Sequence, residues 1–161
     1  MSIKAQQLGM YFLLMALSLV VFVIALGPGL FNSAAVSILS WQHDAFHLLC
    51  HQSADRSYFI GGVKMAVCSR CIGIYSAFLL GVLIMPLIPR FFFVINRKIL
   101  QLIIVAIVIN FLDVLGNGIG IWTNTLHSRF FLGAFFGLSL ALILTSEFFK
   151  QINIKEKDYG K

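Results

Sequence analysis

The sequence predicts an all-α fold: a polytopic membrane bundle of four transmembrane helices, with one further helix that is interfacial or half-buried. Of the 161 residues, 60% are hydrophobic and only 11% are charged. An ordinary soluble domain carries about 25% charged residues, and a single globular core cannot bury so large an apolar excess. Four apolar runs also approach the roughly 20 residues that a helix needs to cross a bilayer. The lipid bilayer is therefore the expected main partner of this chain.

These four apolar runs are the predicted spans. They cover residues 10–26, 71–88, 99–121 and 130–149. The first run is longer than the usual apolar region of a signal peptide, so we expect it to remain as a span and not to be cleaved. Pro86 and Pro89 end the second run, because proline lacks the amide hydrogen that continues a helix. Residues 1–149 are thus predicted to form one transmembrane domain, followed by a cytoplasmic basic tail at residues 150–161.

A helix of a different kind is expected at residues 32–52. Asn32 or Ser33 is a suitable N-cap, because either side chain can accept a hydrogen bond from the first turn. Apolar residues recur along the segment at helical spacing, namely Ile38, Trp41, Ala45 and Leu48. One apolar face on an otherwise polar helix is typical of an interfacial or half-buried position.

The distribution of basic residues predicts the orientation of the bundle. With four spans, one side of the membrane holds eight of them: Lys4, Arg90, Arg97, Lys98, Lys150, Lys155, Lys157 and Lys161. The other side holds Arg56, Lys64, Arg70 and Arg129. Under the positive-inside rule both termini are expected in the cytoplasm, with residues 32–70 on the non-cytoplasmic face. Because the basic residues lie at the ends of apolar runs and form no amphipathic surface, nucleic acid is excluded as a partner.

Soft ligands for a metal gather at the predicted outer end. A helix over residues 32–52 would carry His43, His47, Cys50 and His51 on one stripe. Cys68 and Cys71 follow as a C-x-x-C pair where the second span begins. Thiolate and imidazole are the usual ligands of zinc and of other divalent transition metals. The pattern predicts such a site, structural or hydrolytic, with the ligands Cys50, His51, Cys68 and Cys71.

A second chemistry remains open for the same cysteines. In a membrane thiol-disulfide oxidoreductase Cys68 and Cys71 would cycle, and Cys50 would resolve or exchange the disulfide. The Cys71 thiolate would be stabilised by a helix N-terminus and by Arg70. Against this alternative, a disulfide leaves the third cysteine and the adjacent histidine unexplained, whereas a four-ligand metal site uses them together.

Asp113 is the most costly residue to place, because it lies inside the third apolar run. It shares a helical stripe with Asn110 and Asn117, and an ionisable residue inside a span normally has a partner. We expect that partner to be Arg70 or Arg129, in a pair that either orients the helices or forms a catalytic set. As a catalytic set, Asp113 would be the base, and the arginines would hold an anionic lipid or small-molecule substrate. A transporter that uses Asp113 is a further alternative and would require a homo-oligomer, so the presence of an enzymatic activity stays open.

Small residues predict how the helices approach one another. The second span carries Gly73-x-x-x-Ala77-x-x-x-Gly81, and the fourth carries Gly133-x-x-x-Gly137. Such stripes let transmembrane helices pack closely, and they indicate a compact bundle.

Several strings of the sequence together resemble one known family. They are Cys50-His51-Gln52, Arg56-Ser57, Cys68-Ser69-Arg70-Cys71-Ile72-Gly73-Ile74-Tyr75, the intramembrane Asp113, and Thr123-Asn124 with Arg129 and Gly133. This pattern is similar to that of a bacterial multi-pass membrane family catalogued as domain of unknown function 2085. The resemblance implies a small polytopic protein of the bacterial cytoplasmic (inner) membrane and no particular activity. The family favours a glycine directly after the aspartate, where this chain has Val114, and its signature does not include His43 or His47.

Overall fold

The computed structural model describes residues 3–30, 38–84 and 96–158. Its four longer helices are α1 (Ile3–Leu26), α3 (Ser69–Ile84), α4 (Asn96–Gly118) and α5 (Leu126–Asp158). The shorter elements are η1 (Pro28–Leu30), α2 (Trp41–Phe46), η3 (Ala54–Arg56), β1 (Phe59–Ile60) and β2 (Val63–Lys64). The two strands pair in an antiparallel hairpin that the apolar pattern did not predict. The fold is otherwise helical, in agreement with the predicted class.

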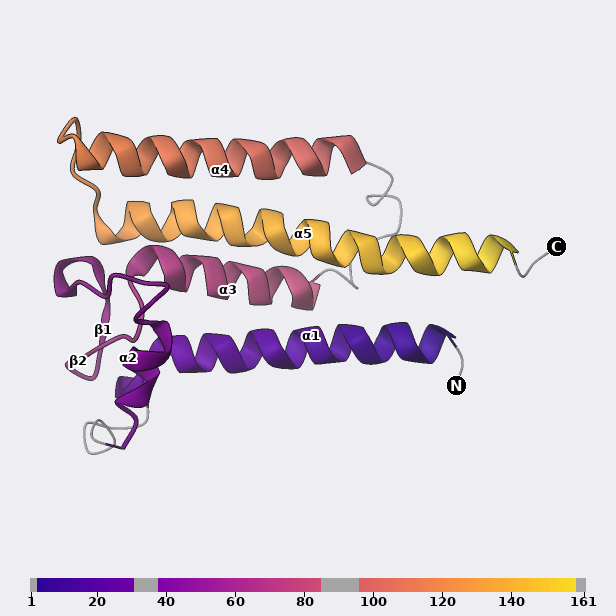
Figure 1. Ribbon diagram of the computed structural model, residues 1–161, viewed down its shortest axis with the longest axis horizontal. Helices are drawn as coiled ribbons and strands as arrows, with labels where there is room; N and C mark the ends of the chain where they lie inside the picture. The colour runs from indigo at the N-terminus through magenta and orange to yellow at the C-terminus, as the bar shows by residue number, and fades with distance from the viewer. Residues whose placement is uncertain (1–2, 31–37, 85–95, 159–161) are drawn as a thin grey trace.

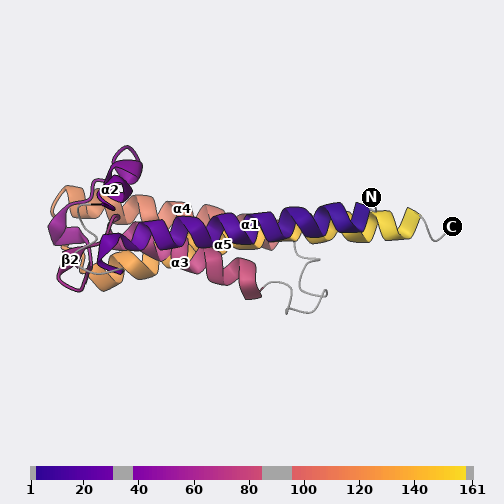
Figure 2. The ribbon, with the colours of Figure 1, turned by 90° about the horizontal axis from the view of Figure 1, so that it is seen from below.

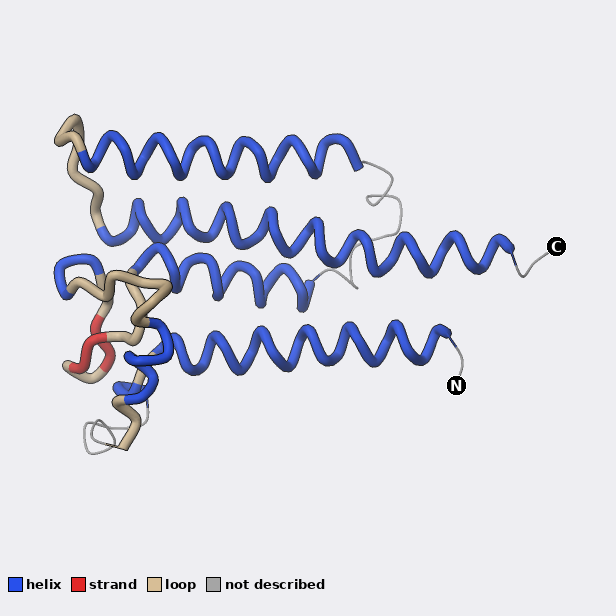
Figure 3. The backbone as a smooth tube through the Cα atoms, viewed as in Figure 1, coloured by secondary structure: helices blue, strands red, loops and turns tan. Residues whose placement is uncertain are grey.

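The longer helices lie side by side in the order α4, α5, α3, α1 (Figure 1). α3 packs most extensively against α5, and α4 packs on α5 while α1 packs on α3. The start of α1 and the end of α5 lie together at one end of the bundle (Figures 1 and 2). The short elements gather at the opposite end, where α1 ends and α3 begins (Figure 3). We call this end, formed by residues 38–70 and 113–130, the capped end.

Within residues 3–30, 38–84 and 96–158, three helices are long and apolar enough to cross a membrane. They include the segments Leu8–Leu26, Leu100–Gly118 and Leu126–Leu144. Large apolar side chains on α1 and α4, such as those of Leu13 and Phe111, are more than half exposed, as lipid-facing residues would be. The apolar helix α3 has 16 residues and is about 24 Å long, which is shorter than the roughly 30 Å hydrocarbon core. Residues 85–88 of the predicted second span lie outside the described residues, and so do Pro86 and Pro89, which were expected to end it.

The other predicted spans differ from the helices at their polar ends. α1 begins at Ile3, before the apolar run at residue 10, and α5 continues to Asp158 through most of the predicted basic tail. Backbone hydrogen bonding within a helix does not require apolar side chains, so a helix extends beyond the stretch that hydropathy marks. The sequence therefore located these helices better than it located their ends.

The helix expected at residues 32–52 is wrong in extent. Within the described residues it covers only Trp41–Phe46, followed by a turn at 47–49, and both proposed caps lie outside the described residues. The side chains buried from α2 are Gln42 and Phe46, whereas Trp41 and Leu48 of the predicted apolar face are exposed. The predicted His/Cys stripe is interrupted, because Cys50 and His51 follow the helix and its turn in a segment without regular secondary structure.

The two small-residue stripes face each other between α3 and α5. A Cβ atom added to Gly73 would meet backbone atoms of Phe130 and Ala134, and one added to Gly133 would meet the carbonyl group of Arg70. At the far end of the contact, a Cβ on Gly81 would lie 2.6 Å from that of Ala141. The stripes thus bring the two backbones together and hold the first turn of α3 against the first turns of α5.

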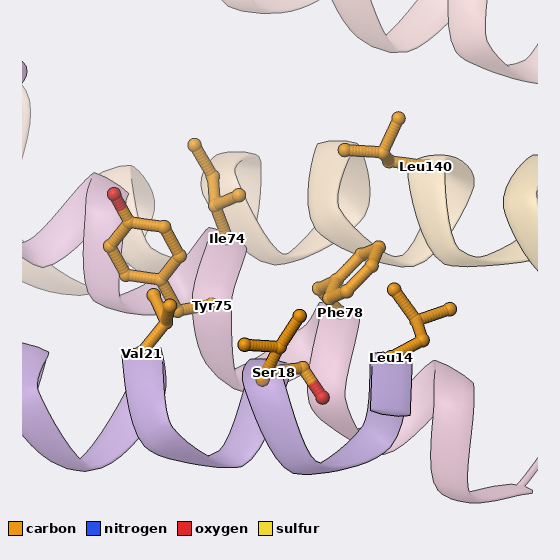
Figure 4. A pocket seen from close by; sticks show the side chains of 8 residues that line it. Leu14, Ser18, Val21, Ile74, Tyr75, Phe78 and Leu140 are labelled. Atoms are coloured by element: carbon orange, nitrogen blue, oxygen red, sulfur yellow. The ribbon is translucent and has the colours of Figure 1, made fainter. Parts of the chain in front are cut away.

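An apolar cavity of about 280 Å³ lies between α1, α3 and α5 (Figure 4). Its lining consists of Leu14, Leu17, Ser18, Val21, Ile74, Tyr75, Phe78 and Leu140. The Ser18 hydroxyl donates to the Met15 carbonyl oxygen at 2.8 Å, so it is already hydrogen-bonded within α1. The polar chemistry of the described chain therefore lies elsewhere, at the capped end.

Candidate functional site

The three cysteines converge at the capped end, although two separate segments carry them. The Sγ atoms of Cys50, Cys68 and Cys71 all lie within 4.8 Å of one another, and all three are free thiols. The Sγ atoms of Cys68 and Cys71 are 3.5 Å apart. The Cys68 amide donates to the Cys50 sulfur at 3.1 Å, which ties the two segments together.

Local structure explains why the thiols meet. Cys68 directly precedes α3 and Cys71 lies in its first turn, so their side chains emerge near the same helix start. Cys50 is buried, and it belongs to an apolar cluster with Phe46, Met65 and Ile72. Burial of these side chains away from water packs the segment after α2 against the start of α3. The thiol group therefore lies against apolar side chains of the protein interior.

Gln52 has a left-handed backbone conformation directly after Cys50 and His51. It has a positive φ of 50°, which is uncommon for a residue other than glycine. Its side-chain amide donates to the His43 carbonyl oxygen at 2.6 Å, and its own carbonyl accepts from Lys64 Nζ at 2.7 Å. Sequence reasoning missed this positioning role, because nothing in residue type distinguishes a left-handed glutamine from any other.

The histidines are not part of the thiol group. Among the described residues, the atoms that converge within 4.8 Å belong to the three cysteines alone. His51 and His47 are exposed, and His43 is half-buried. His127 Nδ1 lies 3.2 Å from the hydroxyl oxygen of Tyr58. Convergence of Cys50 with the C-x-x-C pair agrees with the prediction, while ligation by His51 stays a prediction.

The neighbouring sulfurs affect the acidity of Cys68. Hydrogen bonds from Cys50 first, and then from Cys71, stabilise its thiolate and lower the pKa of the Cys68 thiol below its ordinary value. A thiolate is the form that binds a metal or attacks a disulfide. The cluster is therefore suited to either chemistry.

A polar network next to the thiols joins α3, α4 and the loop before α5. Arg70 forms an ion pair with the buried carboxylate of Asp113, which confirms the expected partner. Asn124 Nδ2 donates to the same carboxylate oxygen at 2.7 Å. Asn124 is a second positioning residue without a role assigned by the sequence, because its loop position gave no periodic signal.

The predicted asparagine stripe of α4 faces α5. Asn117 Oδ1 accepts a hydrogen bond from the backbone N–H of Asn124 at 3.1 Å and another from Arg129 Nη2 at 3.1 Å. Asn110 Nδ2 lies 3.1 Å from the carbonyl oxygen of Leu132 on α5. Arg129 therefore joins the network through an asparagine and not through Asp113.

Comparison with known proteins places this chain in a family. Residues 50–143 match the family described as predicted membrane protein, domain of unknown function 2085. The chain belongs to this family. It is also 36% identical to the uncharacterized protein MJ1492 of Methanocaldococcus jannaschii over 114 residues, which are 70% of this chain and 71% of that protein. None of the solved structures matches this chain.

The family assignment agrees with the resemblance found in the sequence. The relative is archaeal, so the resemblance to a bacterial family does not extend to a bacterial origin for the chain. The matched region contains all three cysteines together with the Arg70–Asp113 pair. The thiol group and the Arg70–Asp113 pair thus both lie in the region that the family model matches.

Proposed function

We propose that this membrane protein holds one zinc ion, or another divalent transition metal, on the thiolates of Cys50, Cys68 and Cys71. The observation that carries the proposal is the convergence of their three Sγ atoms within 4.8 Å. Thiolates that bind one tetrahedral zinc at about 2.3 Å have sulfur atoms about 3.8 Å apart. The present spacing is close to that value, so adjustment of side-chain rotamers suffices to bind the ion.

The proposed fourth ligand is His51, which directly follows Cys50. A closed Cys₃His set is typical of a structural zinc site. With water in the fourth position, the same ion would instead activate that water for hydrolysis. Because the three cysteines come from the segment after α2 and from the start of α3, the bound ion would in either case fasten that segment to the bundle.

The proposed topology places this site on the non-cytoplasmic face. The start of α1 and the end of α5 share the end of the bundle opposite the cysteines, as a four-span protein requires (Figure 1). α3 is proposed as the fourth span. Both termini are then cytoplasmic, and the protein belongs to the cytoplasmic membrane.

The rival function is a membrane thiol oxidoreductase, which the Cys68–Cys71 sulfur separation of 3.5 Å favours. Oxidation would form a bond between these two sulfurs, with transfer of two protons and two electrons to an acceptor disulfide, which becomes two thiols, or to a quinone, which becomes a quinol. Cys50 lies close enough to attack that disulfide. The two functions differ in what occupies the thiols of the isolated protein.

Metal content and thiol titration of the purified protein distinguish these functions. The protein is prepared in neutral detergent without chelators, for elemental analysis and for thiol counting under air. The metal proposal expects about one zinc per chain, and its loss in Cys50→Ser, Cys68→Ser and Cys71→Ser alike. His47→Ala is the control, because His47 is exposed and lies outside the thiol group, and it should retain the metal.

The opposite results would overturn the metal proposal. A protein without metal, with two of three thiols lost under air and Cys50→Ser still able to form the disulfide, is the outcome expected of the oxidoreductase. Ligation by His51 is tested separately with His51→Ala. Retention of wild-type metal affinity by that variant would leave water or another group as the fourth ligand.

A further inference from the structure

A second cavity at the capped end has a different character from the apolar one. Its volume is about 270 Å³. It is lined by Arg56, Arg70, Val114, Asn117, Gly118, Asn124 and Arg129. Three of these seven residues are arginines, two are asparagines and none is acidic. Such walls exclude an apolar occupant and favour an anion.

The charges around this cavity do not balance within the described residues. Arg70 is paired with Asp113, and Arg56 is paired at 3.4 Å with Asp55 on the exposed surface. In the described part of the chain Arg129 forms no ion pair, and its hydrogen-bond partner Asn117 is neutral. Three guanidinium groups therefore face two carboxylates, and an excess positive charge remains at the half-buried Arg129.

Two guanidinium donors are also unused. The Nε atoms of Arg70 and Arg129 are buried and, among the described residues, have no hydrogen-bond acceptor. A buried donor without an acceptor costs about 1–3 kcal/mol, so native proteins rarely leave one without a reason. An anion bound in the cavity would supply acceptors for both arginines at once.

The arginines are held in place by the rest of the network. Arg70 lies in the first turn of α3 and is fixed by Asp113 of α4, and Arg129 lies in the first turn of α5 and is fixed by Asn117 of α4. The backbones of α3 and α5 touch where a Cβ on Gly133 would meet the Arg70 carbonyl. Side chains held in this way lose little further entropy when a ligand binds.

We propose that this cavity binds a phosphate group through Arg56, Arg70 and Arg129. A carboxylate has only two oxygen atoms to accept hydrogen bonds from three guanidinium groups. A tetrahedral phosphate group has three or four acceptor oxygens, so it can accept a hydrogen bond from each of the three arginines. The cavity lies at the end of α4 and the beginning of α5, where the candidate spans Leu100–Gly118 and Leu126–Leu144 end and begin, and where the headgroups of a bilayer crossed by these helices would lie. The phosphate therefore belongs to a lipid headgroup or to a soluble phosphate compound, and the proposal is independent of the metal site.

Arg129→Gln is the main test variant, because it removes the guanidinium that has no carboxylate partner. Lys98→Gln is the matched control, since it removes the same charge from the opposite end of α4. Arg56→Gln is a second test, because the Arg56 side chain is 47% exposed and is less involved in the packing of the helices. Circular dichroism and size-exclusion chromatography establish that each variant folds.

Binding is measured with two probes. The first is inorganic phosphate, titrated against protein in neutral detergent at constant ionic strength, with thermal unfolding as the readout. The second is phosphatidylglycerol, whose enrichment around the protein is measured in phosphatidylcholine nanodiscs that contain it as a minor component. We expect saturable binding of at least one probe, a loss of about tenfold or more in affinity in Arg129→Gln and a smaller loss in Arg56→Gln, and wild-type behaviour in Lys98→Gln.

The pattern of binding then identifies the source of the phosphate. Saturation by inorganic phosphate alone supports a soluble compound, and enrichment of phosphatidylglycerol alone supports a lipid headgroup. Binding of both probes supports recognition of the phosphate group itself. Binding of neither probe, or equal losses in Lys98→Gln and Arg129→Gln, would overturn the proposal, because a general charge effect does not depend on the cavity.

Discussion

Replacement of Asp113 by asparagine is expected to destabilise the protein by about 2–3 kcal/mol. The carboxylate accepts hydrogen bonds from Arg70 and from Asn124. A hydrogen bond to a charged group contributes about 1.5–3 kcal/mol to stability, and a bond between neutral groups contributes about 0.5–1.5 kcal/mol. Each of the two hydrogen bonds therefore contributes about 1–1.5 kcal/mol less when the neutral asparagine replaces the carboxylate. Breaking a fully buried ion pair costs about 3–5 kcal/mol. The Arg70 side chain is 23% exposed, which places the expected loss below that range.

The free energy of unfolding can be measured by SDS titration in mixed micelles, with tryptophan fluorescence as the signal. Asp55→Asn is the control, because Asp55 makes an exposed ion pair with Arg56 and exposed pairs contribute little. In the double variant with Arg70→Gln, the loss should be at least about 1 kcal/mol smaller than the sum of the single losses. A stability of Asp113→Asn within about 0.5 kcal/mol of the wild type, or additive losses in the double variant, would show that the Arg70–Asp113 pair does not stabilise the protein.

Three further predictions concern packing, backbone conformation and topology. Gly133→Leu should separate α3 from α5 and cost about 3 kcal/mol or more in the same titration, whereas Gly9→Leu, with no atom within 4 Å of its added Cβ, should be close to neutral. Gln52→Ala should be less stable than Gln52→Gly, because both lose the hydrogen bond to His43 and only alanine is strained at a φ of 50°; equal stabilities would contradict this. A membrane-impermeant maleimide should label Asp55→Cys in intact cells above the level of the wild type, which carries the three native cysteines, and should label Lys155→Cys no more than the wild type; the reverse pattern would invert the proposed topology.

The helices were predictable because the signal for them is local. An apolar run of sufficient length favours a helix in lipid whatever the rest of the chain does, since every backbone polar group must be hydrogen-bonded within the segment. In this way α1, α4 and α5 were located. The helix at residues 32–52 was predicted differently, from the periodic spacing of its apolar residues, and this prediction made it too long, because the chain leaves the helix after Phe46.

The candidate site was predictable in its composition and less so in its arrangement. A carboxylate inside a span needs a partner, so the pairing of Asp113 followed from energetic cost alone. Energetic cost did not predict which arginine would pair with Asp113. The pairing with Arg70, and not with Arg129, depends on how α3 and α5 are rotated about their axes. The cysteines were recognised as candidate ligands by residue type. Their convergence depends on packing between segments distant in sequence, and the left-handed backbone of the nearby Gln52 has no sequence signature.

Composition and periodicity are properties of the chain that every conformation shares, and they were sufficient to predict a helical membrane protein with thiols and charges at one end. Contacts between residues distant in sequence are a property of one conformation. Close packing at Gly73 and Gly133 sets the distance between α3 and α5, and the packing of α4 on α5 then brings Asp113 of α4 to Arg70 of α3. The three thiols likewise meet only after the segment that carries Cys50 has packed against the start of α3, because burial of its apolar neighbours, and not the spacing of the cysteines, brings them together.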